Sequence, residues 1–316
     1  MSVFLLKRFL TFVATLLGAS IVVFLALEIL PGDPAQVMSG TDAPPEVVEN
    51  LRRKLGLDRP PLERYFAWVG GLLQGDLGIS YAYSTPVGEL IAERMKVTLP
   101  LALIAMALTT IAALALGLFA AQRHGRLGDV GIMGVSQLGI AIPNFWFGIL
   151  LILLFAVKLQ WVAAGGFPGW EEGVWPAIRA LLLPAIALAT VQAAILARIT
   201  RSAVLEVLRE DFVRTARAKG LSRRRALWTH VLRNALIPVI TIMGLQFSNL
   251  LAGTIVVENV FYLPGLGRLI FQAISNRDLI VVKDAVLLLA AMVVAVNFVV
   301  DLLYAVIDPR LKAHDV

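Results

Sequence analysis

The stretch VTLPLALIAMALTTIAALALGLFAAQ, residues 97–122, contains no charged residue. It is long enough to cross a lipid bilayer as a helix, for which about 20 apolar residues suffice. Five more stretches reach or approach this length: Phe9–Leu27, Val130–Val157, Ala180–Ala197, Ala235–Val257, and Ala285–Val300 with its continuation past Asp301 to Ile307. Strands would be shorter and would alternate, whereas these runs are apolar all round. The sequence therefore predicts an all-α membrane protein with six transmembrane helices.

The composition excludes several classes of protein. The mean hydropathy is +0.81 and 16% of the residues are charged, whereas soluble domains average about 25%. The chain has no cysteine, and its histidines, His124, His230 and His314, lie far apart, so we expect no metal site and no thiol chemistry. The sequence contains no G-x-x-x-x-G-K-[ST], H-E-x-x-H or G-x-S-x-G pattern. We therefore expect no catalytic residues and no ATP bound by this chain.

Lysine and arginine set the orientation, because they are enriched in cytoplasmic loops. The segments placed inside are the loop 204–233 with eight basic residues, the pair Lys7–Arg8, the loop 123–126, and the tail with Arg310 and Lys312. The segments placed outside are 31–96, with nine acids and seven bases, and the loops 158–179 and 258–284. Both termini are predicted to be cytoplasmic. The first apolar run is longer than a signal peptide requires and is predicted to be a retained span.

The chain divides into a first transmembrane helix (1–30), an extracytoplasmic cap segment (31–97), a five-helix core (98–307) and a cytoplasmic tail (308–316). In the cap, Glu46 in a first turn and Gly56 as a stop predict an amphipathic helix over 46–56 with Val47, Val48, Leu51 and Leu55 on one face. A second amphipathic helix is expected from Leu62 to Leu73. We therefore expect a small folded cap.

Four of the predicted spans each place one amide near their midpoint, namely Asn144, Gln192, Gln246 and Asn297. Asn249 shares a face with Gln246 and Gly253 at helical spacing. These amides are candidates for a polar translocation pathway, and the alternative is that they form hydrogen bonds between helices.

Charged residues within the spans are few. Glu28, Arg198 and Asp301 lie near span ends, and we predict that Asp301 pairs with Arg198 or Arg201. No chain of carboxylates lies at membrane depth, as a proton- or sodium-coupled carrier would need. Energy for transport is therefore expected to come from outside the bilayer.

The basic loop contains signals that stop one helix and start another. Helical spacing places Leu205, Leu208, Phe212 and Ala216 on one apolar stripe, and Lys219-Gly220-Leu221 is a helix stop. Ser222 can cap a second short helix that contains Ala226, Leu227 and Val231. If the basic residues served only to keep the loop on the cytoplasmic side, no helix stop and cap would be needed. Nucleic-acid binding would need a broader basic surface. We therefore favour an elbow that docks to a partner protein.

The stretch Arg214-Thr215-Ala216-Arg217-Ala218-Lys219-Gly220 resembles the E-A-A-x-x-x-G loop of ABC importer permeases, in the variant typical of the dipeptide and oligopeptide branch. Arg214 and Thr215 depart from the general consensus in the way usual for that branch. Further stretches resemble the B-type permease pattern: Leu30-Pro31-Gly32-Asp33-Pro34, Gln74-Gly75-Asp76-Leu77-Gly78, Pro143-Asn144-Phe145-Trp146, Leu232–Pro238, and Val256-Val257-Glu258 through Pro264-Gly265-Leu266-Gly267-Arg268. The resemblance covers nearly the whole chain.

The resemblance implies a type I ABC importer permease in the bacterial cytoplasmic membrane. Its partners would be a second, homologous permease in a heterodimer, two cytoplasmic ATPases that bind ATP and Mg²⁺, and an extracytoplasmic substrate-binding protein, with no nucleic acid and no cofactor on this chain. In the coupling loop, Gly220 would set the elbow angle, Ala216 and Leu221 would fill an ATPase groove, and Arg217 and Lys219 would contact its rim.

The substrate is the least determined expectation. The resemblance implies di- or oligopeptides, and alternatives within the same machinery are glutathione, nickel chelates, opines and oligosaccharides. From other classes, a stand-alone secondary carrier or channel and a membrane-tethered nucleic-acid-binding regulator remain as alternatives. ATP-dependent uptake with the partner ATPases would separate these classes.

Overall fold

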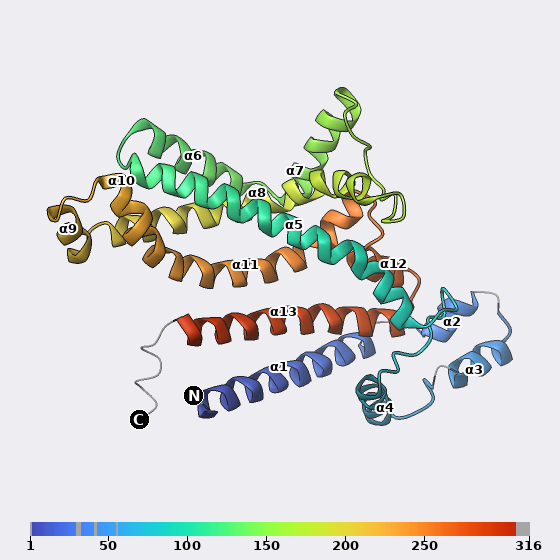
Figure 1. Cartoon of the computed structure of the whole chain (residues 1–316). Helices are drawn as coiled ribbons and strands as arrows, with labels where there is room; N and C mark the ends of the chain where they lie inside the picture. Colours follow the sequence, from blue (N-terminus) through green and yellow to red (C-terminus); the bar gives the residue numbers. More distant parts are fainter. Residues whose placement is uncertain (1, 30–32, 41–42, 55, 308–316) are drawn as a thin grey trace. The chain divides into compact units, whose positions relative to one another are not determined.

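The computed structural model describes residues 2–29, 33–40, 43–54 and 56–307, and in these ranges it is helical apart from turns and one isolated β-bridge between Ile79 and Pro86 (Figure 1). The motif residues 30–32, Leu55 of the predicted cap helix, and the tail with Arg310, Lys312 and His314 lie outside the described residues. Within these described ranges, the helices long and apolar enough to span a membrane number five, or six when one bent pair is taken as a single span. The predicted all-α membrane fold is confirmed.

Five of the spans are single helices: α1 (Ser2–Glu28), α5 (Val87–Gln122), α8 (Val174–Val207), α11 (Leu232–Val260) and α13 (Leu279–Ile307). Pro100, Pro184 and Pro238 lie inside α5, α8 and α11, which continue through them.

The third predicted span is not one straight helix. It consists of α6 (Leu127–Ala141), followed after a bend of 101° by α7 (Asn144–Leu151), which continues as the π-helix η1 (Ile152–Lys158). At the bend Ile142 is extended, with φ −90° and ψ 123°, as a residue before proline prefers. Asn144 is therefore the first residue of α7 and does not lie in the middle of a straight span, which corrects the sequence-based expectation.

The described chain separates into two compact units, and each contains its own packed helices. The first unit comprises residues 99–263 together with the C-terminal part of the chain from Val296. Here α8 contacts α6, α7 and α11. Small residues dominate its buried surface: Ala177, Ala185, Ala187, Ala189, Ala193, Ala194 and Ala197. Such residues allow helix backbones to approach closely in a membrane, so α8 is the centre of this unit.

At Gly117, α5 approaches α8 closely. A Cβ added at Gly117 would lie 2.6 Å from the Ala197 carbonyl oxygen and 2.7 Å from Thr200 Cβ. We expect Gly117→Val to destabilise the protein by about 3 kcal/mol, because the backbone of α8 cannot give way to the new side chain. Thermal unfolding followed by tryptophan fluorescence would measure this. The control is Gly131→Val in α6, where a Cβ would meet nothing within 4 Å, and equal melting temperatures for the two variants would contradict the packing argument.

The second unit comprises residues 2–98 and 264–295. It contains α1, the start of α5 and of α13, α12 (Leu266–Ser275), and the cap helices α2 (Pro34–Ser39), α3 (Pro45–Lys54) and α4 (Pro61–Gln74). Both predicted cap helices are confirmed, and Gly75 ends α4 in the left-handed conformation. Val48 is buried but Val47 is 51% exposed, so the apolar face of α3 is narrower than expected.

Two buried acids that the sequence analysis missed tie the second unit together. Asp278, fully buried, accepts hydrogen bonds from Ser80 Oγ at 2.5 Å and from the Ala82 backbone N–H at 3.2 Å. Asp284 is also buried and accepts from Trp68 Nε1 at 2.6 Å. These bonds fasten the cap segment to the start of α13.

Candidate functional site

The basic loop folds into an elbow of two short helices. Helix α9 (Asp211–Ala218) is followed by Lys219 as its C-cap and then by Gly220, whose φ is +94°. The Gly220 N–H donates to the Arg217 carbonyl at 3.0 Å, and the Leu221 N–H donates to the Ala216 carbonyl at 3.2 Å. This pair of bonds is the Schellman motif, which requires a left-handed residue at the position of Gly220. The predicted helix stop is confirmed.

The second arm begins where the sequence predicted. The Ser222 hydroxyl accepts a hydrogen bond from the Arg225 backbone N–H at 3.3 Å and caps α10 (Arg223–Ala226), which continues as the π-helix η2 (Leu227–Val231) and then as α11. Ala226, Leu227 and Val231 are all buried. The turn between the two arms is therefore fixed on both sides by local hydrogen bonds.

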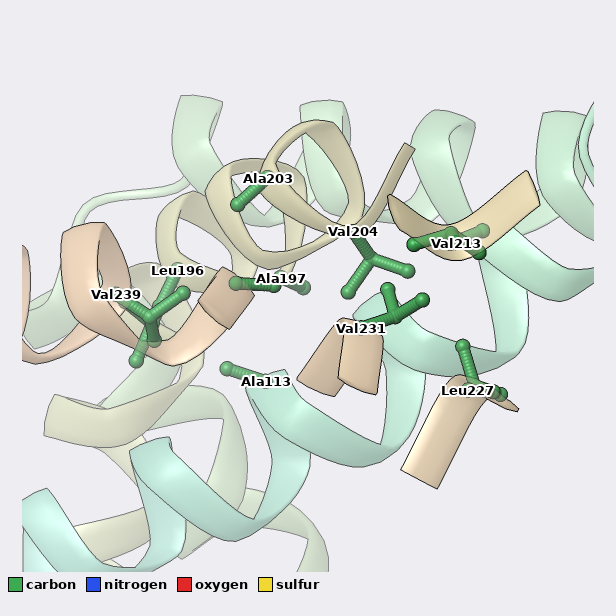
Figure 2. Close-up of a cluster of buried hydrophobic side chains, with 11 residues drawn as sticks. Ala113, Leu196, Ala197, Ala203, Val204, Val213, Leu227, Val231 and Val239 are labelled. Atoms are coloured by element: carbon green, nitrogen blue, oxygen red, sulfur yellow. The ribbon is translucent and has the colours of Figure 1, made fainter. Parts of the chain in front are cut away.

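Within the first unit, the elbow packs on α8 through a hydrophobic cluster. Figure 2 shows Val213 of α9 and Leu227 and Val231 of η2 converging on Val204 of α8. The predicted continuous stripe through Leu205, Leu208, Phe212 and Ala216 is wrong, because α8 ends at Val207 and α9 starts in a new register at Asp211. Val213 takes the inward position, and Phe212 is 43% exposed.

The exposed side of the elbow combines cations with apolar groups. Arg217 and Lys219 are exposed, and Ala216 and Leu221 are partly exposed. Arg214 pairs at the surface with Asp211 at 3.3 Å, which contributes little to stability. The residues predicted for coupling thus lie on one short segment that is rigid at its turn and accessible on its outer side.

An ion-pair cluster lies at the same end of the first unit, at the turn between α5 and α6. Arg201 Nε and Nη2 donate to the two carboxylate oxygens of Asp129 at 2.5 and 2.7 Å. Asp129 is buried, and it also accepts from the Gly125 backbone N–H at 3.0 Å and lies 3.1 Å from His124 Nδ1. The carboxylate partner of Arg201 is thus Asp129, which the sequence analysis did not identify. The pairing of Asp301 with Arg198 or Arg201 stays a prediction.

The predicted amides meet along α11. Gln246 Nε2 donates to the Gln192 backbone carbonyl at 3.1 Å, and Ser248 Oγ donates to Asn297 Oδ1 at 3.2 Å. A Cβ added at Gly253 would lie 3.5 Å from Asn144 Nδ2. Gln192 and Gln246 are both buried, and the amide of Gln246 corresponds to the alternative interpretation, a hydrogen bond between helices.

Asn249 differs from the other amides because it is exposed on α11. At helical spacing it lies on the same face as Leu245 and Val256, which are exposed as well. An amide that faces lipid is costly unless a partner group covers it. This face of α11 therefore has the properties of a surface that a second subunit or a polar pathway covers.

The described residues thus combine five or six candidate membrane spans with an elbow of two short helices between α8 and α11, and the family comparison assigns this architecture to the class of transport permeases. The chain is a member of the family of binding-protein-dependent transport system inner membrane components, whose main domain matches residues 113–313 and whose N-terminal domain matches residues 1–102.

Individual relatives agree with this assignment. The chain is 43% identical to a peptide transport system permease protein of Brucella abortus, with 99% of each chain covered. It is 41% identical to the glutathione transport system permease protein of Escherichia coli, with 98% of each chain covered. The crystal structure of an amino acid ABC transporter with histidines matches its fold with a TM-score of 0.52 at 16% identity, over 69% of this chain and 94% of that chain.

The protein is therefore a multi-pass inner-membrane permease with the fold of type I ABC importers. Membership in this family implies an ATPase and a substrate-binding protein as partners.

Proposed function

We propose that this chain pairs with a second, similar permease and moves di- and oligopeptides into the cytoplasm by alternating access. Two ATPase subunits bind ATP and Mg²⁺, and this chain binds neither. An extracytoplasmic binding protein delivers the peptide. ATP binding brings the ATPases together and biases the permease pair between its inward- and outward-facing states.

The elbow carries this proposal. Its turn is fixed by the Schellman bonds at Gly220 and by the Ser222 cap, and its inner side is packed through Val213 and Leu227. A displacement applied to its outer side is therefore transmitted to α8 and α11 instead of being absorbed by the loop. Ala216 and Leu221 supply the apolar contact to an ATPase groove, and Arg214, Thr215, Arg217 and Lys219 supply the polar rim.

The proposal of a peptide substrate is supported by the chemistry of the Asn249 side chain and by the names of the relatives. The Asn249 amide can both donate to and accept from a peptide backbone without imposing a charge. The relatives are named for peptides and for glutathione, which is itself a tripeptide. Nickel chelates, opines and oligosaccharides stay as alternatives, and ligand screening of the binding protein that delivers substrate would separate them.

Reconstitution tests the proposed machinery. Proteoliposomes with both permeases, both ATPases and the binding protein are expected to accumulate a labelled dipeptide only with ATP. Omitting the ATPases or the binding protein should abolish uptake. Uptake by this chain alone, driven by a proton or sodium gradient, would instead support a secondary carrier.

The exposed amide of Asn249 and the buried amide of Gln246 are expected to respond differently to mutation. Asn249→Leu is expected to lower peptide uptake about tenfold, equivalent to the loss of about one hydrogen bond, with an unchanged melting temperature. Gln246→Leu should instead lower stability by about 1 kcal/mol through loss of its bond to α8. If Gln246→Leu impaired uptake at unchanged stability while Asn249→Leu had no effect, the pathway would lie on the buried side of α11.

A further inference from the structure

The second unit holds a cavity of about 300 Å³ between the C-terminal end of α1, helix α4 and the start of α13. Its walls are largely apolar and include Phe24, Leu27, Leu57, Trp68, Leu279 and Ile280. A cavity of this size accommodates a small ligand. None of the side chains assigned above to coupling or to the pathway lines it.

The charged groups in the cavity are mainly cations. Four basic side chains line it, namely Arg59, Arg64, Arg277 and Lys283, against the carboxylates of Glu28 and Asp76. Glu28 forms an ion pair with Arg64, and Asp76 accepts one hydrogen bond from the Gly78 backbone N–H at 2.9 Å. The cavity therefore has a surplus of positive charge and suits an anion.

One of the residues that line the cavity has a buried donor without an acceptor. Within the described part of the chain, Arg64 Nε is buried without a hydrogen-bond partner, although the far end of the same guanidinium pairs with Glu28. A buried N–H without an acceptor is costly and needs an explanation. Burial raises the pKa of the Tyr81 phenol, and Asp278 acts in the same direction. Tyr81, which also lines the cavity, therefore keeps its proton and can donate too.

The surroundings of the cavity are those of a membrane–water interface. Phe24, Tyr65 and Trp68 form an aromatic cluster, with ring centroids 5.4 to 6.3 Å apart. Tryptophan and tyrosine are enriched at this depth. The adjacent surface of α1 is apolar and exposed at Ile21, Val22 and Leu25. An apolar helix surface thus leads directly to a cationic cavity.

We propose that this cavity binds the headgroup of an anionic phospholipid from the outer leaflet, with the phosphate at Arg64 and the acyl chains along α1. On the cytoplasmic side of membranes, basic pockets between transmembrane helices bind anionic headgroups, and the same attraction between cations and a phosphate applies to this cavity on the outer side. A peptide fits less well, because four basic side chains surround the two carboxylates that could hold its ammonium group, and Glu28 is already paired with Arg64. The proposal does not depend on the identity of the transported substrate.

Native mass spectrometry of the assembled transporter, released from nanodiscs of phosphatidylglycerol and phosphatidylethanolamine, tests the site. The wild type is expected to retain one more phosphatidylglycerol per copy of this chain than Arg277→Gln, which removes a cation, or Ala67→Trp, which fills the cavity. The matched controls are Arg53→Gln in α3 and Leu73→Trp in α4, whose residues do not line the cavity. Both controls should retain the wild-type number.

Three outcomes would overturn the proposal. Equal lipid retention by all five proteins would show that the cavity holds no lipid. Equal retention of phosphatidylethanolamine would show that it does not select an anion. Displacement of the lipid by free glycerol 3-phosphate or by a transported dipeptide, at concentrations comparable to that of the lipid, would assign the cavity to a soluble ligand. Loss of phosphatidylglycerol only in Arg277→Gln and Ala67→Trp, with no displacement by either compound, would support it.

Discussion

Gly220→Val in the assembled transporter is expected to reduce ATP-driven uptake at least tenfold, while the chain still inserts and the ATPases still hydrolyse ATP. Gly220 has φ +94°, where an L-residue is strained and a β-branched residue most of all. A Cβ at this position would meet nothing within 4 Å. The expected effect of Gly220→Val is therefore caused by backbone conformation and not by a steric clash. A valine at this φ would be strained by about 1–3 kcal/mol, which would favour a different turn.

A different turn would break the two bonds that define the elbow, from Gly220 to Arg217 and from Leu221 to Ala216. The outer side of α9 would then point elsewhere, and movement of the ATPases would no longer reach α8 and α11. The measurement is the number of peptides transported per ATP hydrolysed in proteoliposomes, together with the amount of inserted protein.

A graded series separates backbone conformation from side-chain size. Asn tolerates the left-handed region better than other residues, so Gly220→Asn should retain most of the uptake and Gly220→Ala an intermediate part. Arg217→Gln should change the affinity for the ATPase more than the coupling ratio. Wild-type coupling in Gly220→Val would exclude Gly220 as the residue that sets the elbow angle.

The elbow could be predicted from the sequence because its determinants are local. Gly220 and Ser222 each act on backbone groups within five residues, as their hydrogen bonds show. The same holds for the cap helix α4 and its left-handed stop at Gly75. Signals of this kind depend little on tertiary packing.

The broken third span could not be predicted in the same way. Pro143 interrupts the helix, whereas Pro100, Pro184 and Pro238 lie inside continuous helices. Proline weakens a helix in every case, but the packing around it determines whether the chain bends. At Gly148, which follows the bend, a Cβ would lie 3.0 Å from the Phe261 ring, a close approach that only the folded structure reveals.

The buried acids were missed for a related reason. Asp278 and Asp284 lie near the end of a segment that the sequence assigned to an external loop, and their partners Ser80 and Trp68 are 198 and 216 residues away. The choice of Asp301 as a partner for Arg201 likewise rested on depth in the membrane alone. The structure provides Asp129, 72 residues away, which a local hydrogen bond from the Gly125 N–H holds in the first turn of α6.

Asp129→Asn is expected to destabilise the protein by about 3 kcal/mol, because it leaves Arg201 without its carboxylate partner. The Asp129 side chain is 4% exposed and that of Arg201 20%, so water screens the pair only weakly. The pair joins the turn between α5 and α6 to α8, close in sequence to where α8 leads into the elbow. Uptake should therefore fall together with stability.

A double-mutant cycle isolates the pair from general damage. Asp129→Asn combined with Arg201→Gln should cost about 2 kcal/mol less than the sum of the two single changes, because the second change removes an ion that the first left unpaired. A second double-mutant cycle, with Arg198→Gln in α8 and Asp301→Asn in α13, tests the ion pair predicted from the sequence. Arg198 is exposed, and exposed ion pairs contribute at most about 1 kcal/mol, so its coupling should be the smaller of the two. Additive effects at Asp129 and Arg201, with strong coupling at Arg198 and Asp301, would instead place the structural ion pair between α8 and α13.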